Sequence, residues 1–193
     1  MPRWAALVMA PLLLLGGCRG AEEPGTGSRP QGGGPSPAGT PGKLPGASCE
    51  DQEGGNSQIF PDFISVNLES DGGVDRVSFR FRQTDPDATD PPLYFVRYVD
   101  QLVTDGEGAP VEVEGKAFVS VSFMAVGVDL SGETPIEVYT GPDEFTPQFP
   151  TVRELEKTGD FEGVVSWGIG LAHKACVVVE ATDRELVLEF PSP

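Results

Sequence analysis

The sequence predicts an all-β fold, an antiparallel β-sandwich preceded by a disordered tether. Three observations predict the fold class. Apolar and polar residues alternate with a period of two from about Ile59 onward, turn residues recur about every ten to fifteen positions, and no long amphipathic helix pattern is present. Short strands separated by turns bury their apolar faces by stacking two sheets, so a sandwich follows.

The first half of the domain contains four predicted strands, one of them short. In 76–82, three apolar residues alternate with arginine and serine, which predicts a half-buried strand. The segment 93–99 is apolar on nearly both faces and rich in aromatic and β-branched residues, which is typical of a central strand. The segment 117–123 alternates again, and 105–115 is typical of a short strand between two turns.

The second half adds three strands and one ambiguous element. Residues 163–171 and 176–181 are typical of strands, and a turn at 182–184 leads into the last strand of a hairpin. The segment 151–159 has the capping-box spacing of a helix, but it is under three turns long and its neighbours are strands. We therefore expect a strand there, ending at the turn in 158–163.

The N-terminus has the features of a secretory signal peptide that ends at a cysteine. Arg3 precedes an apolar run over 4–15, which is shorter than the roughly 20 residues of a membrane-spanning helix. Residues 15–18, Leu-Gly-Gly-Cys, resemble the lipobox of bacterial lipoproteins, in which the cysteine sulfur takes a diacylglyceryl group. The resemblance implies that residues 1–17 are removed and that Cys18 becomes a lipidated membrane anchor. An ordinary secretory signal with a chance cysteine is the alternative.

Residues 18–58 are predicted to be the lipidated cysteine and a disordered tether. Gly, Pro and Ser dominate 19–48, and the only large aliphatic residue there is Leu44. Such a segment cannot bury enough apolar surface to offset the entropy of ordering it. The predicted organisation is therefore a signal peptide, this tether, and one β-domain over 59–193.

The composition excludes some partners. The chain carries 13 Lys and Arg against 30 Asp and Glu, a formal net charge of −17. So acidic a chain does not bind nucleic acid by neutralising phosphates, and anionic lipid head groups repel it, so a lipid must supply the membrane attachment. If Cys18 carries that lipid, Cys49 and Cys176 remain as a pair in an oxidising compartment, and we expect a disulfide between them. Two separate buried thiols are the alternative.

Four stretches carry a resemblance to a known family: GVDRVSFRF (73–81), VRYVD (96–100), DGEGAPVEVEGKAF (105–118) and, as the most specific, TGDFEGVVSWGIGL (158–171). Together they resemble the AMIN-like domain of actinobacterial secreted proteins and lipoproteins. The resemblance implies a β-sandwich related to the AMIN domains of cell-wall amidases and secretins. In those proteins the domain targets the cell envelope, often through peptidoglycan, and is not catalytic.

One cluster of charges is a candidate binding surface. Arg76, Arg80 and Arg82 share the polar face of one predicted strand, and Arg97 lies nearby if its strand pairs with the first. These arginines either pair with Glu and Asp across the sheet or form a cationic stripe that binds carboxylates of peptidoglycan peptides or other wall polyanions. The sequence leaves both interpretations open.

No catalytic or metal site is expected. His173, the only histidine, has no positioned nucleophile beside it, and one histidine with a bridged cysteine pair cannot supply a zinc site. The three aspartates of 85–90 lack the glycine and closing glutamate of a calcium loop, so a solvated loop is expected. Asp160 and Glu162 resemble an acid–base pair, but turn chemistry explains them, with Phe161 entering the core.

The sequence therefore predicts a non-catalytic binding module without a cofactor. It is expected at the extracytoplasmic face of the plasma membrane, held by its lipid and docked on cell-wall polymer. The alternatives are a structural lipoprotein with a protein partner only, and an accessory of a cell-wall hydrolase.

Overall fold

The computed structural model describes residues 43–193, and no helix occurs among them. The predicted signal peptide, Cys18 and the tether up to residue 42 lie outside the described residues. Within the described part, no helix is long and apolar enough to cross a membrane.

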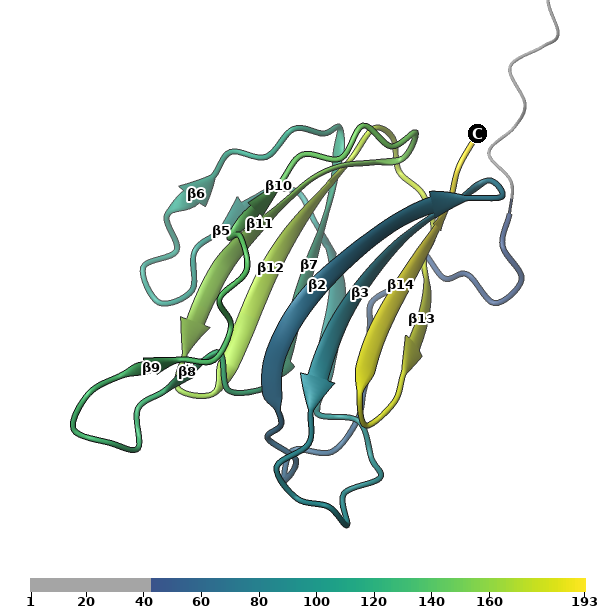
Figure 1. Ribbon diagram of the computed structural model, residues 1–193. Helices are drawn as coiled ribbons and strands as arrows, with labels where there is room; N and C mark the ends of the chain where they lie inside the picture. The colour runs from purple at the N-terminus through teal and green to yellow at the C-terminus, as the bar shows by residue number, and fades with distance from the viewer. Residues whose placement is uncertain (1–42) are drawn as a thin grey trace, which may run out of the picture. The chain divides into compact units, whose positions relative to one another are not determined.

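Two antiparallel sheets form the domain, as predicted (Figure 1). The six-stranded sheet has the order β1-β4-β7-β12-β11-β10, with bounds Gln52–Gly54, Tyr94–Val99, Ala117–Met124, Val164–Leu171, Val152–Phe161 and Glu144–Phe145. The four-stranded sheet has the order β13-β14-β3-β2, with bounds Val178–Ala181, Glu185–Pro191, Val74–Arg82 and Asp62–Asp71. Two small hairpins complete it, with bounds Leu102–Val103 (β5), Pro110–Val111 (β6), Val128–Asp129 (β8) and Ile136–Glu137 (β9).

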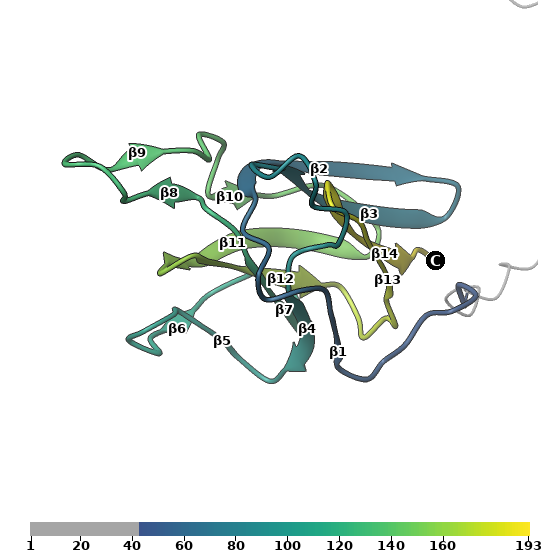
Figure 2. The same cartoon turned by 90° about the horizontal axis from the view of Figure 1, so that it is seen from below.

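The core lies between the two sheets, which Figure 2 shows as separate layers. Alternation along β3 and β14 points their apolar side chains at the inward side chains of β7 and β12. Aromatic rings fill the centre: Phe63 stacks on Tyr139 at 4.5 Å between ring centroids and meets Phe123 at 5.2 Å and Trp167 at 6.3 Å, both edge-on. These rings supply much of the buried apolar surface that drives folding.

The predicted strands are confirmed, including the ambiguous one. Residues 152–159 belong to β11 (Val152–Phe161), which pairs with β12 along its length. The folded part begins earlier than the predicted boundary at residue 59, because β1 pairs with β4 and Ser48 bridges Val177. Hydrophobic periodicity misses this segment, since backbone pairing and not apolar side chains holds it.

A buried carboxylate joins the two sheets. Asp75 at the start of β3 is 0% exposed, and its Oδ2 accepts the backbone N–H groups of Thr151 and Val152 at 2.6 and 2.9 Å. Its Oδ1 accepts the hydroxyls of Ser70 and Ser192 at 2.7 and 2.8 Å. With four donors on one side chain, the charge of Asp75 is compensated without water.

The chain between β4 and β7 folds over the outer face of the six-stranded sheet. Two glycines of β12 make room for it. A Cβ at Gly168 would lie 2.6 Å from a methyl of Leu102, and a Cβ at Gly170 would collide with the backbone carbonyl of Glu114. The glycines of the WGIGL motif therefore allow a close approach of backbone to sheet.

Candidate functional site

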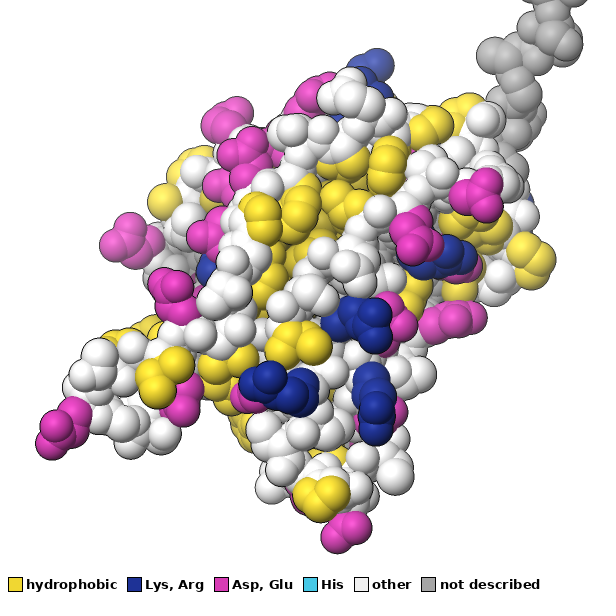
Figure 3. All heavy atoms as spheres, in the orientation of Figure 1, with side chains coloured by type: hydrophobic (Ala, Val, Ile, Leu, Met, Phe, Trp, Pro, Cys, Tyr) yellow, Lys and Arg dark blue, Asp and Glu magenta, His cyan; other side chains and the backbone are white. Residues whose placement is uncertain are grey.

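The outer face of the four-stranded sheet carries the predicted arginines. Alternation along β3 buries Val77 and Phe79 and turns Arg76, Arg80 and Arg82 outward. In Figure 3, Lys and Arg side chains gather over the lower part of this face. The prediction that these three arginines share one strand face is confirmed.

Two of the three are neutralised by carboxylates on neighbouring strands. Arg76 lies between Glu69 of β2 and Glu189 of β14, with N–O distances of 3.2 and 2.5 Å, and the hydrogen bond to Glu189 raises the pKa of Arg76. Arg82 pairs with Asp62 at 2.6 Å, its cross-strand neighbour. For both residues the structure shows cross-strand ion pairing, which leaves little charge free.

Arg80 differs from its neighbours. It is exposed, lies between Ser65 and Glu185 in the sheet register, and makes no ion pair within 4.0 Å among the described residues. Arg80 lines a hollow of about 610 Å³ together with Arg82 and with Arg184 of the β13–β14 turn. We call this hollow the arginine hollow; Ile64, Gln83, Asp85 and Asp183 also line it.

Arg97 does not belong to this surface. It lies on β4 in the six-stranded sheet, whereas Arg80 lies on β3 in the other. Its guanidinium stands over the ring of Phe95, 4.8 Å from the centroid. The expectation that Arg97 joins the stripe through strand pairing is therefore wrong, because β4 pairs with β1 and β7 and not with β3.

The predicted Cys49–Cys176 disulfide is present, with the two Cα atoms 4.4 Å apart. The disulfide links the segment before β1 to the segment before β13. β1 is an edge strand of the six-stranded sheet, and β13 is an edge strand of the four-stranded sheet. Tyr98 supports it: the phenolic hydroxyl donates to the carbonyl of Ala175 at 2.8 Å and lies 3.3 Å from that of Ser48. Burial raises the pKa of Tyr98 to about 12. Sequence periodicity placed Tyr98 in a strand but gave no sign of this contact.

The other acidic candidates have structural roles. Asp85 accepts the backbone N–H of Asp87 at 3.0 Å and Asp90 accepts from Asn56 at 3.0 Å, contacts typical of loop organisation. Among residues 43–193, no group of three or more His, Cys, Asp and Glu is arranged to hold a metal ion. His173 is half-buried in the loop after β12.

The prediction for Phe161 is wrong: its side chain is 65% exposed. The register of β11 against β12 shifts between Lys157 and Gly159, which reverses the alternation beyond that point. Asp160 therefore turns inward, where burial raises its pKa, and Phe161 turns outward. The turn itself is confirmed within the predicted range, at Glu162 and Gly163, which have φ values of 52° and 76°.

The comparison with protein families now identifies the domain. The sequence model of the AMIN-like domain family matches residues 62–191 of the chain. The chain belongs to the AMIN-like domain family. No curated protein and no solved structure matches the chain. AMIN-like domains are generally non-catalytic binding modules associated with peptidoglycan, which implies a location in the cell envelope outside the cytoplasm.

Proposed function

We propose that this protein is a lipid-anchored module that docks on an anionic cell-wall polymer through the arginine hollow. Family membership supports a binding role at the envelope. The lipobox-like motif at Cys18 supports a lipid anchor. The choice of surface depends on Arg80. Its side chain is exposed, and its guanidinium has no carboxylate partner among the described residues.

The arginine hollow suits carboxylate recognition. A guanidinium donates two parallel N–H groups to one carboxylate, a geometry that lysine cannot offer. Arg184 is 79% exposed and Arg82 65% exposed, so both guanidinium groups are accessible beside Arg80, although each is paired, with Asp183 and Asp62 respectively. At about 610 Å³, the hollow lies within the range of ligand-binding clefts.

One observation favours a protein partner as the second candidate. The β8–β9 hairpin extends away from the body of the domain (Figures 1 and 2), and Leu130 and Ile136 on it are 60% and 61% exposed. Large apolar side chains on a projecting hairpin are typical of contact surfaces between proteins.

Cosedimentation with purified cell walls tests the proposal. We expect Arg80→Ala to reduce the bound fraction severalfold, while Arg97→Ala, which removes the same charge from the opposite sheet, binds as the parent does. Circular dichroism checks the fold of both variants. Equal binding by the parent and Arg80→Ala would exclude the arginine hollow. If Leu130→Ser instead abolishes recovery of a partner protein and no variant affects wall binding, the second candidate is favoured.

A further inference from the structure

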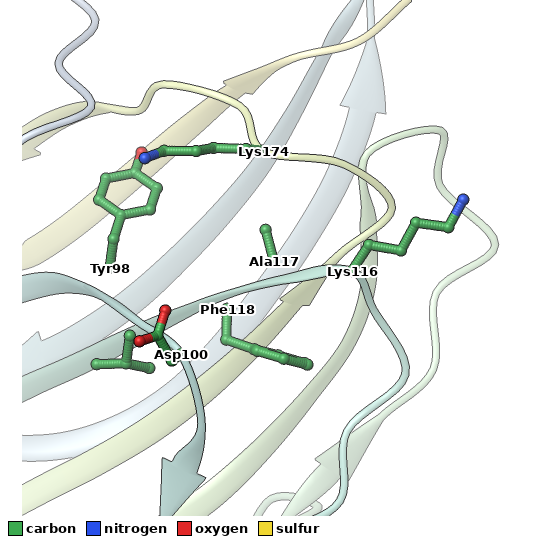
Figure 4. Close-up of a pocket in the computed structure, with 7 residues that line it drawn as sticks. Tyr98, Asp100, Lys116, Ala117, Phe118 and Lys174 are labelled. Carbon is green, nitrogen blue, oxygen red and sulfur yellow. The ribbon is translucent and has the colours of Figure 1, made fainter.

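A second hollow lies at the end of the six-stranded sheet, away from β3. It has a volume of about 360 Å³, and its lining comes from the end of β4, the start of β7 and the loop after β12. Figure 4 shows its lining side chains, among them Tyr98, Asp100 and Lys174. The small side chain of Ala117 at the start of β7 leaves the space open. We call it the lysine hollow.

The lysine hollow contains opposite charges that do not neutralise one another. Lys174 and Asp100 are both exposed and both line it, yet neither makes an ion pair within 4.0 Å among the described residues. Figure 4 shows Lys174 extended toward the hydroxyl end of Tyr98 and Lys116 directed away from it. Lys116 also lines the hollow, but because its side chain is directed away, the charges left facing each other without a counter-charge are those of Lys174 and Asp100.

The ring of Tyr98, over which the Lys174 ammonium lies, is held in place. The ammonium of Lys174 stands 5.5 Å from the centroid of the Tyr98 ring, a cation–π contact. The Tyr98 hydroxyl bonds the carbonyl of Ala175, and the next residue, Cys176, is bridged to Cys49. A site fixed in this way loses little conformational entropy when a ligand binds.

Apolar side chains also line the hollow. Val99 and Phe118, cross-strand neighbours on β4 and β7, contribute carbon surface to the lining. A ligand that fits must offer a carboxylate to Lys174 and an ammonium to Asp100. Such a ligand has no net charge, so the acidity of the chain does not repel it.

We propose that the lysine hollow binds a zwitterionic ligand of the size of an amino acid or short peptide. The carboxylate lies at Lys174 and the ammonium at Asp100. The site is separate from the arginine hollow, and the inference does not rest on the proposed wall docking. Its volume is near the lower end of the range for small-ligand sites, in agreement with a ligand of this size.

The test uses three probes and the full chain. Alanylalanine carries both charges, its N-acetyl derivative lacks the ammonium and its C-terminal amide lacks the carboxylate. In an NMR titration of the ¹⁵N-labelled chain, we expect alanylalanine to shift the amides of Ala117 and Lys174. We expect each modified probe to bind about tenfold more weakly, as for the loss of one hydrogen bond to a charged group.

Two variants and a control complete the experiment. Lys174→Met is expected to bind alanylalanine and its amide equally, and Asp100→Asn to bind alanylalanine and its N-acetyl derivative equally. Arg80→Ala is expected to bind all three probes as the parent does. Absence of binding, equal binding of the three probes to the parent, or unchanged discrimination in both variants would overturn the proposal. None of these outcomes bears on wall cosedimentation, so the two proposals fail separately.

Discussion

Substitution of Asp75 tests how the two sheets are joined. In Asp75→Ala, the N–H groups of Thr151 and Val152 lose their acceptor, and both residues are 0% exposed, so water cannot replace it. Each buried unpaired N–H costs about 1–3 kcal/mol, so we expect the free energy of unfolding to fall by about 2–6 kcal/mol. That is a large share of the stability of a typical domain, about 5–15 kcal/mol.

Asp75→Asn separates hydrogen bonding from charge. The amide oxygen can still accept both N–H groups, and the amide nitrogen can donate to the Ser70 and Ser192 oxygens that now donate to Asp75. We expect this variant to cost only about 1–2 kcal/mol, the difference between charged and neutral hydrogen bonds.

Urea unfolding followed by tryptophan fluorescence measures both losses, because Trp167 lies in the core. Asp71→Ala in the same hairpin is the matched control, since Asp71 is exposed, and we expect a change within about 0.5 kcal/mol. A loss below about 1 kcal/mol in Asp75→Ala would refute the reasoning. Equal losses in the Ala and Asn variants would show that charge, not acceptance of the N–H groups, is what matters.

Three further predictions concern other parts of the domain. Replacing both Cys49 and Cys176 by Ser should lower the free energy of unfolding by about 4–5 kcal/mol, because the bridge spans 127 positions; a shift in the urea midpoint measures it, and no shift contradicts the assignment. Burial raises the pKa values of Tyr98 and Tyr139 to about 12, whereas unfolded tyrosine ionises near 10, so the folded chain binds more protons between these values. Stability should therefore fall as pH rises from about 10 to 12, and a Tyr98→Phe, Tyr139→Phe variant that keeps the full slope would exclude this cause. Phe161→Ser should change stability by less than about 1 kcal/mol, since the ring is 65% exposed, and a core-sized loss of about 3 kcal/mol would contradict its outward position.

The alternation of side chains predicted the strands because one face of each is buried. The same alternation also indicates that Asp75 is buried. Asp75 is in phase with Val77 and Phe79, so an aspartate occupied a core position. A charged residue at a core position is buried only if hydrogen-bond donors surround it. The alternation therefore predicts that Asp75 accepts hydrogen bonds in the core, but it does not identify the donors.

The remaining contacts could not be read from periodicity. The register shift within β11 inverted the prediction for Phe161, because a bulge leaves no mark on the apolar pattern before it. Arg184 and Lys174 lie in a turn and a loop, and their position beside Arg80 and Tyr98 depends on how the strands are ordered. Strand order also separates Arg97 from the predicted stripe. Alternation predicts which face of a strand a side chain occupies, but it does not predict which sheet the strand joins.

Salt dependence should distinguish the two hollows. The described residues carry 10 Lys and Arg against 28 Asp and Glu, so a polyanion bound at the arginine hollow is repelled by carboxylates elsewhere on the domain. Raising the ionic strength from about 0.01 to 0.15 M shortens the Debye length from about 30 to 8 Å, which screens that distant repulsion more than a direct contact to Arg80.

Wall binding should therefore be strongest at intermediate salt and weaker at about 1 M, where the Debye length of about 3 Å also screens the contact itself. Alanylalanine has no net charge, so the distant carboxylates do not repel it, and its binding at the lysine hollow should only decline with salt. Cosedimentation and NMR titration at these three salt concentrations measure the two profiles. A steady decline of wall binding from the lowest salt would mean that the polymer contacts a surface away from the acidic background, or that it is not a polyanion.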